Sequence, residues 1–489
     1  MKNHLIYILL LSLTMTSCNK WIDVHPTDRI SENELFTKKE GFLKALNGIY
    51  IAISDPELYG RFLTAGELDA MGQYYMKASA YHDYSMFMAY QHNDAVSKAA
   101  FDATWKKAYS SIMNINILLE KCGDEPSSSL PEPYFSLVKG EALALRAFLH
   151  FDMLRVFGPI YTLDSQKEVI PYYTLPNFEI APLYSSEVIC EKVLADFQLA
   201  HELLKKVDPI QTNGISIPKE EMLDNSLNYR QYRLNYFAIE ALQARVHLWM
   251  GNREEAGSIA KATIHAVQQE AKPIFPFVTP ADATNNLLPD RLFSSEVMFG
   301  VYTVNRANLY NTRFSASLGL LERLSANAGD AVMTRVDAMY SDKNDYRYKI
   351  WEVVNNNGNL VLVNQKFQDA VDLPARYMLP LVRISELYLI AAECESDLAA
   401  ATSFVNMLRL NRKAISLQPA TPEALQQLIY EEYRREFIGE GQQFYYYKRR
   451  AFTTIPSETF LNGNKTMDIA NYQVPLPDSE TSMRLPKNN

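Results

Sequence analysis

The apolar residues of this chain recur at helical spacing over long segments, and this periodicity restricts the fold more than any other feature. In residues 99–119, Phe101, Trp105 and Ala108 are three or four positions apart, as on one face of an α-helix. The same pattern predicts helices over residues 39–53, 134–157, 185–207, 229–250, 254–269, 383–398, 399–412 and 422–439. Glycine contributes 18 of the 489 residues, about half of its usual ~7% share. The chain is therefore predicted to be mainly α.

Short connectors separate neighbouring helices. Residues 124–133 are rich in Ser and Pro, and Gly158-Pro159 and Gly251-Asn252 are further stops. Two helices joined in this way form an αα-hairpin. Residues 241–263 partly fit a tetratricopeptide repeat, with small residues where helices pack closely, although an ordinary hairpin would look similar. The sequence thus predicts a scaffold of tetratricopeptide-like helical hairpins.

Over residues 279–376 the sequence pattern changes from helical periodicity to strand-like alternation and turn signals. Glu296–Val304 alternates like a strand, and two short apolar runs flank the hairpin signal Asn355-Asn356-Asn357-Gly358. We expect a loop-rich, partly β insertion in the helical frame. Loops held by a rigid scaffold are where binding sites usually lie.

The first eighteen residues resemble a bacterial lipoprotein signal. Lys2 precedes the apolar run Leu5–Leu13, which is too short to span a bilayer, and small residues then lead to Cys18. Residues 1–17 are predicted to be a signal peptide and Cys18 the lipidation site, which would tether the mature protein to a membrane. The alternative is an ordinary secretory signal with an incidental Cys18.

Few residues suggest catalysis, a metal or a nucleic-acid partner. The common nucleotide, zinc-protease and serine-hydrolase motifs are missing, and the 8 histidines are scattered. Cys122, Cys190 and Cys394 are far apart, which favours free thiols. The net charge is −9 without a basic block, so nucleic acid is an unsuitable partner. We expect neither an enzyme nor a cofactor, although carboxylates are too numerous to exclude a glycosidase.

Aromatic residues crowd two segments that lack helical periodicity, residues 59–90 and 302–351. A flat ring can stack on the apolar face of a sugar while neighbouring polar groups bond its hydroxyls. The predicted ligand-binding residues are Tyr75, Tyr84, Tyr90, Tyr310 and Trp351. The alternative is that these rings pack in the core beneath long loops.

Several short motifs follow one another over nearly the whole chain. They are Trp21-Ile22-Asp23-Val24 and Leu46-Asn47-Gly48-Ile49-Tyr50 after Cys18, Glu141-Ala142 to Phe157-Gly158, Arg383-Ile384-Ser385-Glu386-Leu387, Glu432 to Phe437 with Glu440-Gly441, and Val474-Pro475-Leu476-Pro477. Together they resemble the motifs of the SusD/RagB family of outer-membrane nutrient-binding lipoproteins. Gln443 and Tyr446 depart from it, because the family usually has Arg and Asp there.

The resemblance implies an N-terminal SusD-like region over residues 18–230 and a C-terminal SusD/RagB region over residues 231–489. It implies a lipid anchor in the outer membrane, facing outward, and a SusC-like TonB-dependent transporter as partner. The expected task is to capture oligosaccharide for import, without catalysis. A peptide-binding member, a lipid-anchored glycoside hydrolase and a purely structural scaffold remain as alternatives.

Overall fold

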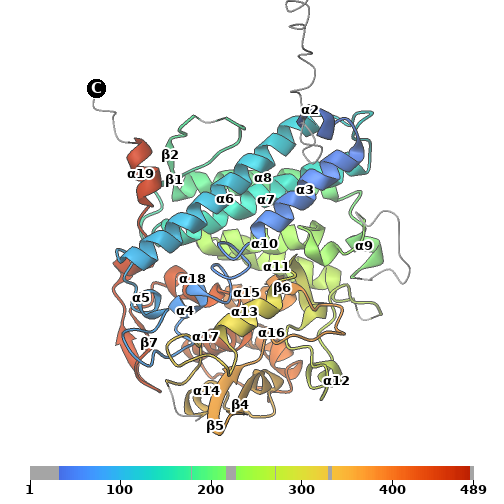
Figure 1. Cartoon of the computed structure of the whole chain (residues 1–489). Coiled ribbons are helices and arrows are strands. Elements are labelled where there is room, and N and C mark those ends of the chain that lie inside the picture. Colours follow the sequence, from blue (N-terminus) through green and yellow to red (C-terminus); the bar gives the residue numbers. More distant parts are fainter. Residues whose placement is uncertain (1–31, 178, 216–226, 270, 329–332, 485–489) are drawn as a thin grey trace, which may run out of the picture.

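A computed structural model describes residues 32–177, 179–215, 227–269, 271–328 and 333–484 (Figure 1). The predicted signal peptide, residues 1–17, and Cys18 lie outside these ranges. Within them, no helix combines the length and apolar character needed to cross a bilayer.

The N-terminal half forms a layer of long helices (Figure 1). Its main members are α3 (Lys39–Ile53), α6 (Ala95–Cys122), α7 (Tyr134–Phe157) and α8 (Ser186–Leu204), with the short helices α2 (Glu32–Leu35), α4 (Glu67–Met71), α5 (Ser85–Met88) and α9 (Ile210–Asn213). Asp94 caps α6 by accepting a hydrogen bond from the Val96 amide, and Ser185 caps α8 in the same way. Helix α7 is buried along nearly its whole length, between α6 and α8. This layer holds the loops that follow α3.

The second group of helices continues the hairpin pattern. It contains α10 (Tyr236–Met250), α11 (Arg253–Val267), α15 (Ile384–Cys394), α16 (Leu398–Leu410) and α17 (Pro422–Glu436). Gly251 adopts φ +85° in the turn between α10 and α11, a conformation that suits glycine. At Gly257 an added Cβ would lie 2.8 Å from Cys394, so the small residue lets α11 approach α15. The predicted mainly α hairpin fold is confirmed.

Several predicted helices begin or end at other residues, and at two of them a further element occupies the difference. The helix expected from residue 229 begins at Tyr236, because Tyr229 has φ +54° and Asn235 caps α10 through the Ala238 amide. Between them lies the 3₁₀ turn η2 (Arg230–Tyr232). The last predicted helix ends at Glu436, and α18 (Gln442–Arg449) follows it.

The insertion contains short helices and paired strands. Its helical elements are α12 (Pro280–Ala283), η3 (Ser294–Glu296), α13 (Arg306–Arg313), α14 (Thr334–Met339) and η4 (Tyr346–Ile350). Strand β3 (Val297–Tyr302) pairs antiparallel with β6 (Met378–Arg383), and β4 (Trp351–Asn356) pairs with β5 (Asn359–Asn364). The remaining elements are β1 (Glu168–Pro171) with β2 (Leu183–Ser185), β7 (Thr454–Pro456) with β8 (Asn464–Thr466), η5 (Ile469–Tyr472) and α19 (Asp478–Arg484).

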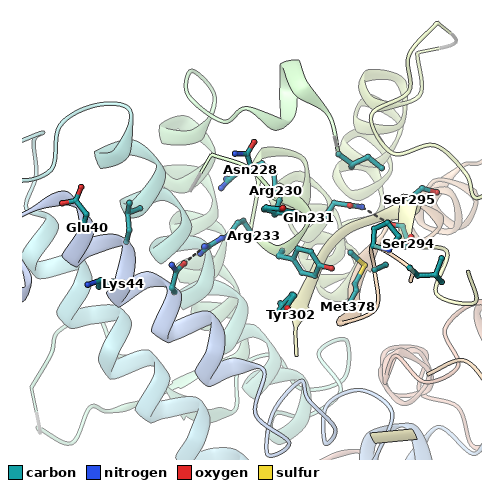
Figure 2. A pocket seen from close by; sticks show the side chains of 18 of the residues that line it. Glu40, Lys44, Asn228, Arg230, Gln231, Arg233, Ser294, Ser295, Tyr302 and Met378 are labelled. Carbon is teal, nitrogen blue, oxygen red and sulfur yellow. Dashed lines mark hydrogen bonds between the residues drawn. The ribbon is translucent and has the colours of Figure 1, made fainter. Parts of the chain in front are cut away.

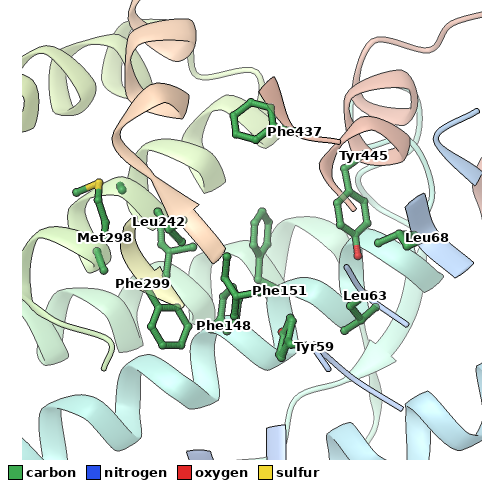
Figure 3. Packing of buried hydrophobic residues seen from close by; sticks show 14 of the residues in the cluster. Tyr59, Leu63, Leu68, Phe148, Phe151, Leu242, Met298, Phe299, Phe437 and Tyr445 are labelled. Atoms are coloured by element: carbon green, nitrogen blue, oxygen red, sulfur yellow. The ribbon is translucent and has the colours of Figure 1, made fainter. Parts of the chain in front are cut away.

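One apolar core joins the two groups of helices to the insertion. Figure 3 shows Phe148 of α7 between Tyr59 from the loop after α3 and Phe299 of β3. The ring centroids of Tyr59 and Phe148 are 5.0 Å apart, and those of Phe148 and Phe299 are 5.7 Å apart. Aromatic pairs at such distances stabilise a core beyond their buried area.

A buried ion network lies beside this core. Its members are Glu296, Arg347, Arg383, Arg412, Glu432 and Glu436, all fully buried. Arg412 lies 2.5 Å from Glu296 and 2.5 Å from Glu436, and Arg347 lies 2.8 Å from Glu432. The network thus links the insertion to α17. Glu432 and Glu436 of the network belong to the motif Glu432 to Phe437.

The C-terminal end of α7 is contacted by a lysine from the C-terminal part of the chain. The buried ammonium of Lys448 donates hydrogen bonds to the carbonyl oxygens of Arg155 (2.7 Å), Val156 (3.2 Å) and Gly158 (2.6 Å). These are carbonyls without partners inside the helix. Lys448 therefore serves as the C-terminal cap of α7.

Candidate functional site

Four of the five rings predicted to bind ligand lie in the core. Tyr75, Tyr84, Tyr90 and Trp351 are at most 5% exposed, and Tyr310 is half-buried. The Tyr75 hydroxyl donates to Asp69 (2.5 Å), and the Tyr75 and Trp351 ring centroids are 6.4 Å apart. The structure thus brings both aromatic segments together, but a ring covered on both faces cannot stack on a sugar. Amphipathic tyrosines suit a core as well as a wet surface.

The two aromatic segments meet at the surface through their backbones. The Met76 amide donates to the Ser325 carbonyl (2.9 Å), and the Asp83 amide donates to the Leu321 carbonyl (2.9 Å). The ring of Tyr81, on this edge, is 86% exposed, and Leu320 and Leu321 are also exposed. The sequence predicts the ligand region in these two segments, and Tyr81 is an exposed ring at the place where they meet.

A polar cluster surrounds Tyr84, three positions after Tyr81 in the chain. Arg61 and Glu67 form an ion pair at 3.1 Å, and the Arg313 guanidinium lies 5.6 Å from the centre of the Tyr84 ring. Four atoms of this cluster are buried without a hydrogen-bond partner, namely Arg61 Nε, Glu67 Oε2, Tyr84 OH and Arg313 Nε. Burial raises the pKa of Glu67, while the charge of Arg61 lowers it. We call Arg61, Glu67, Tyr81, Tyr84, Arg313, Leu320 and Leu321 the loop face.

A second candidate is a cavity of about 860 Å³ beside α3, which we call the α3 pocket (Figure 2). It is lined by α3, η2 and the end of β3, including Leu43, Tyr229, Tyr232, Tyr302 and Met378. Tyr302 is 49% exposed, and its ring centroid lies 5.5 Å from that of Tyr232. Gln231 donates to the Ser294 carbonyl at 2.8 Å (Figure 2), and Arg233 donates to the Asn47 side-chain oxygen.

Sequence reasoning counted Tyr302 among the insertion aromatics but missed Tyr229 and Tyr232. Both were assigned to a helix, whereas the structure places them around η2. The alternation of aromatic and cationic residues in Tyr229-Arg230-Gln231-Tyr232-Arg233 was the available signal. Such alternation is uncommon inside an amphipathic helix with one apolar face.

The described residues offer little reactive chemistry. They contain no group of three His, Cys, Asp or Glu side chains placed to hold a metal. Cys122, Cys190 and Cys394 are free, and burial raises the pKa of the Cys122 thiol to about 12 and of the Cys394 thiol to about 11. Such thiols are poor nucleophiles near neutral pH.

Helical hairpins that carry a loop-rich insertion and an aromatic, polar surface define a helical binding scaffold. Comparison with known families then identifies it. A SusD-like model described as "Starch-binding associating with outer membrane" matches residues 20–209, and a model of the SusD family matches residues 336–484. The chain belongs to the SusD/RagB family. The predicted division at residue 230 stays a prediction.

Two curated relatives come from Formosa agariphila. SusD-like protein P38 is 26% identical over 267 residues, which are 54% of this chain and 45% of the relative, so the match spans about half of each protein. SusD-like protein P25 is 20% identical over 502 residues and covers 91% of this chain and 89% of the relative.

Solved structures share the fold. A SusD-like carbohydrate binding protein from Bacteroides vulgatus matches with a TM-score of 0.67 at 19% identity, over 91% of this chain and 96% of that structure. A SusD superfamily protein from Bacteroides thetaiotaomicron matches with a TM-score of 0.68 at 21% identity, over 91% and 98%. At these identities the matches establish the architecture.

Proposed function

We propose that this protein is an outer-membrane lipoprotein, anchored through Cys18, that binds oligosaccharide and delivers it to a SusC-like TonB-dependent transporter. Family membership and the outer-membrane association in the family description support the general task. The observation that carries the proposal is the loop face. There the exposed ring of Tyr81 precedes Tyr84 by three positions, and the partly exposed side chains of Arg61 and Arg313 interact with Tyr84.

The chemistry of the loop face suits a sugar. The Tyr81 ring offers a flat apolar face to C–H groups. The partly exposed guanidinium groups of Arg61 and Arg313 can donate to hydroxyl oxygens.

Calorimetric titration against a panel of neutral oligosaccharides tests the site. The Tyr81→Ala variant should bind about tenfold more weakly than the wild type, because one stacking contact is lost. Tyr302→Ala is the matched control, since it removes an exposed tyrosine from the α3 pocket. A loss of affinity confined to Tyr302→Ala would indicate that the ligand binds in the α3 pocket instead. If the wild type binds no oligosaccharide, the sugar proposal fails.

The α3 pocket favours a peptide as the second candidate ligand. It combines apolar side chains with backbone groups and the cations Lys44 and Arg233, a pattern that suits an extended peptide. Titration with a mixed peptide library would show binding that Tyr302→Ala weakens and Tyr81→Ala leaves unchanged. Turnover assays on the oligosaccharide panel would reveal a lipid-anchored hydrolase.

The anchor and the transporter need separate tests. Cys18→Ser should release the mature protein from the membrane fraction, and a variant that stays attached would contradict the lipid anchor. Detergent extraction of the native protein should recover a large β-barrel partner. Recovery without such a partner would contradict the delivery step.

A further inference from the structure

A second cavity, of about 350 Å³, lies between α14, α17 and the β7–β8 hairpin. Its lining includes Arg335, Arg434 and Arg435 together with Ser341, Tyr430 and Asn464. We call this cavity the arginine pocket. It lies apart from the α3 pocket, and none of its lining residues belongs to the loop face.

Two of its guanidinium groups converge on one atom. Arg335 Nη2 donates to the Gln73 carbonyl oxygen at 2.7 Å, and Arg434 Nη2 donates to the same oxygen at 3.4 Å. Arg335 is 5% exposed and Arg434 is 8% exposed. Two like charges are therefore held close together in a largely buried place.

Neither arginine forms an ion pair with a carboxylate of the described chain. Arg335 also donates to the Ser457 carbonyl (2.8 Å), and Arg434 donates to the Tyr447 hydroxyl. The nearby acids pair with other cations: Glu431, which also lines the pocket, pairs with Arg435 (2.9 Å). Likewise, Glu458 pairs with Lys465 (2.7 Å) and Lys77 (3.4 Å). The Tyr74 ring, 5.2 Å from the Arg434 guanidinium, offsets only part of the charge.

The pKa of Arg335 agrees with this geometry, whereas neighbouring tyrosines, Tyr447 foremost, raise the pKa of Arg434. Burial, together with the charge of Arg434, lowers the pKa of Arg335 to about 10. A buried charge without a counter-charge is costly, and proteins normally supply one. The Ser341 and Asn464 side chains are exposed and line the same cavity, so additional donors are within it.

We propose that the arginine pocket binds an oxyanion, either a free inorganic anion or the carboxylate or sulfate group of an acidic sugar. The planar guanidinium matches such groups with two parallel hydrogen bonds, and Arg335 and Arg434 would share the anion. This site is independent of the proposed oligosaccharide site. A protein that binds no neutral glycan could still bind sulfate here.

Sulfate titration at constant ionic strength tests the pocket directly. The wild type should bind sulfate saturably, and sulfate should raise its melting temperature by mass action. Asn464→Asp supplies a carboxylate at an exposed position of the pocket, so folding is preserved while the anion meets a like charge. We expect this variant to bind sulfate at least about tenfold more weakly. Arg335→Gln should weaken binding similarly.

Arg376→Gln is the matched control, because Arg376 is paired with Asp369 (2.7 Å) outside the pocket. It should retain wild-type affinity. Glucuronate and glucose 6-sulfate, compared with neutral glucose, distinguish the sources: tighter binding than inorganic sulfate assigns an acidic sugar, and equal or weaker binding assigns a free anion. The proposal is overturned if the wild type gives no saturable sulfate binding, or if Asn464→Asp binds as tightly as the wild type.

Discussion

The buried ion network and the arginine pocket both contain buried arginines. Those of the network have carboxylate partners, whereas Arg335 and Arg434 of the pocket do not. In the network, fully buried Arg412 meets Glu296 and Glu436, each at 2.5 Å. In the pocket, Arg335 and Arg434 are almost as buried but meet carbonyl oxygens and a hydroxyl. Burial alone therefore does not separate a structural arginine from a binding arginine. What distinguishes them is whether the arginine has a carboxylate partner.

Protonation behaviour follows the same division. The carboxylates around Arg412 raise its pKa, and the arginines around Glu436 lower the pKa of that acid. For Arg335 the pKa is lowered, because burial dominates and its neighbour is another cation. Four predictions test this difference and the surroundings of the two sites, in decreasing order of the effect on stability.

Glu436→Gln should remove about 3–5 kcal/mol from the free energy of unfolding, because it leaves buried arginines without their shared carboxylate. Urea denaturation of the variant and the wild type measures the loss. The control is Asp369→Asn, which breaks the exposed pair with Arg376 and should cost about 1 kcal/mol or less. Equal losses in the two variants would show that the buried network stabilises the fold no more than an exposed ion pair does.

Asp69 is a buried acid without an arginine partner, and it should make stability depend on pH. Burial raises its pKa to about 7, although the Tyr75 hydroxyl and the Gly439 and Gly441 amides act in the other direction. Because the folded state holds the proton more tightly than the unfolded state, wild-type stability should fall as pH rises from about 4 to about 7.

Asp69→Asn should remove this contribution, so the difference in unfolding free energy between wild type and variant should shift with pH in that window. Denaturation series at several pH values measure it. A pH-independent difference would show that Asp69 titrates in the folded state as it does in the unfolded chain.

Arg335→Gln should destabilise the protein less than Glu436→Gln does, by about 1–2 kcal/mol. It loses hydrogen bonds to two carbonyls but also removes an uncompensated buried charge. The same denaturation series measures it. A loss as large as that of Glu436→Gln would indicate that Arg335 is held structurally, as Arg412 is.

Tyr81→Ala should change the free energy of unfolding by about 0.5 kcal/mol or less, because the ring is 86% exposed. Its effect should appear in ligand titration alone. A large stability loss would mean that the ring supports the loops rather than the ligand.

The helical frame was predictable because its signals are local. Residues 39–53 and 134–157 were predicted as helices, and the structure has α3 and α7 at those bounds. Apolar spacing marks such helices, and Gly158-Pro159 marks a stop. The start of α6 at Ala95 was missed because its cap, Asp94, follows a loop without periodicity. Helix α18 was missed because Phe444 to Tyr447 are consecutive aromatics with no helical pattern.

The candidate site was less predictable because aromatic side chains serve two purposes. Tyr75 and Trp351 are aromatic residues of the type that stacks on sugars, yet they pack in the core. Tyr81, a few positions away, is the exposed member of the same segment. Which ring faces water depends on backbone contacts such as that of Asp83 with Leu321, and these join residues far apart in the chain. Such long-range pairing leaves no local signal.

The cap that Lys448 places on α7 ties the order of synthesis to the order of folding. Lys448 lies 290 positions after Gly158, so the carbonyls at the end of that helix have no such partner until most of the chain has been made. Premature termination anywhere before α18 would leave this helix end open to competing contacts. Fragments that stop at the end of the first family region should therefore be degraded quickly, whereas the full-length polypeptide should resist proteases.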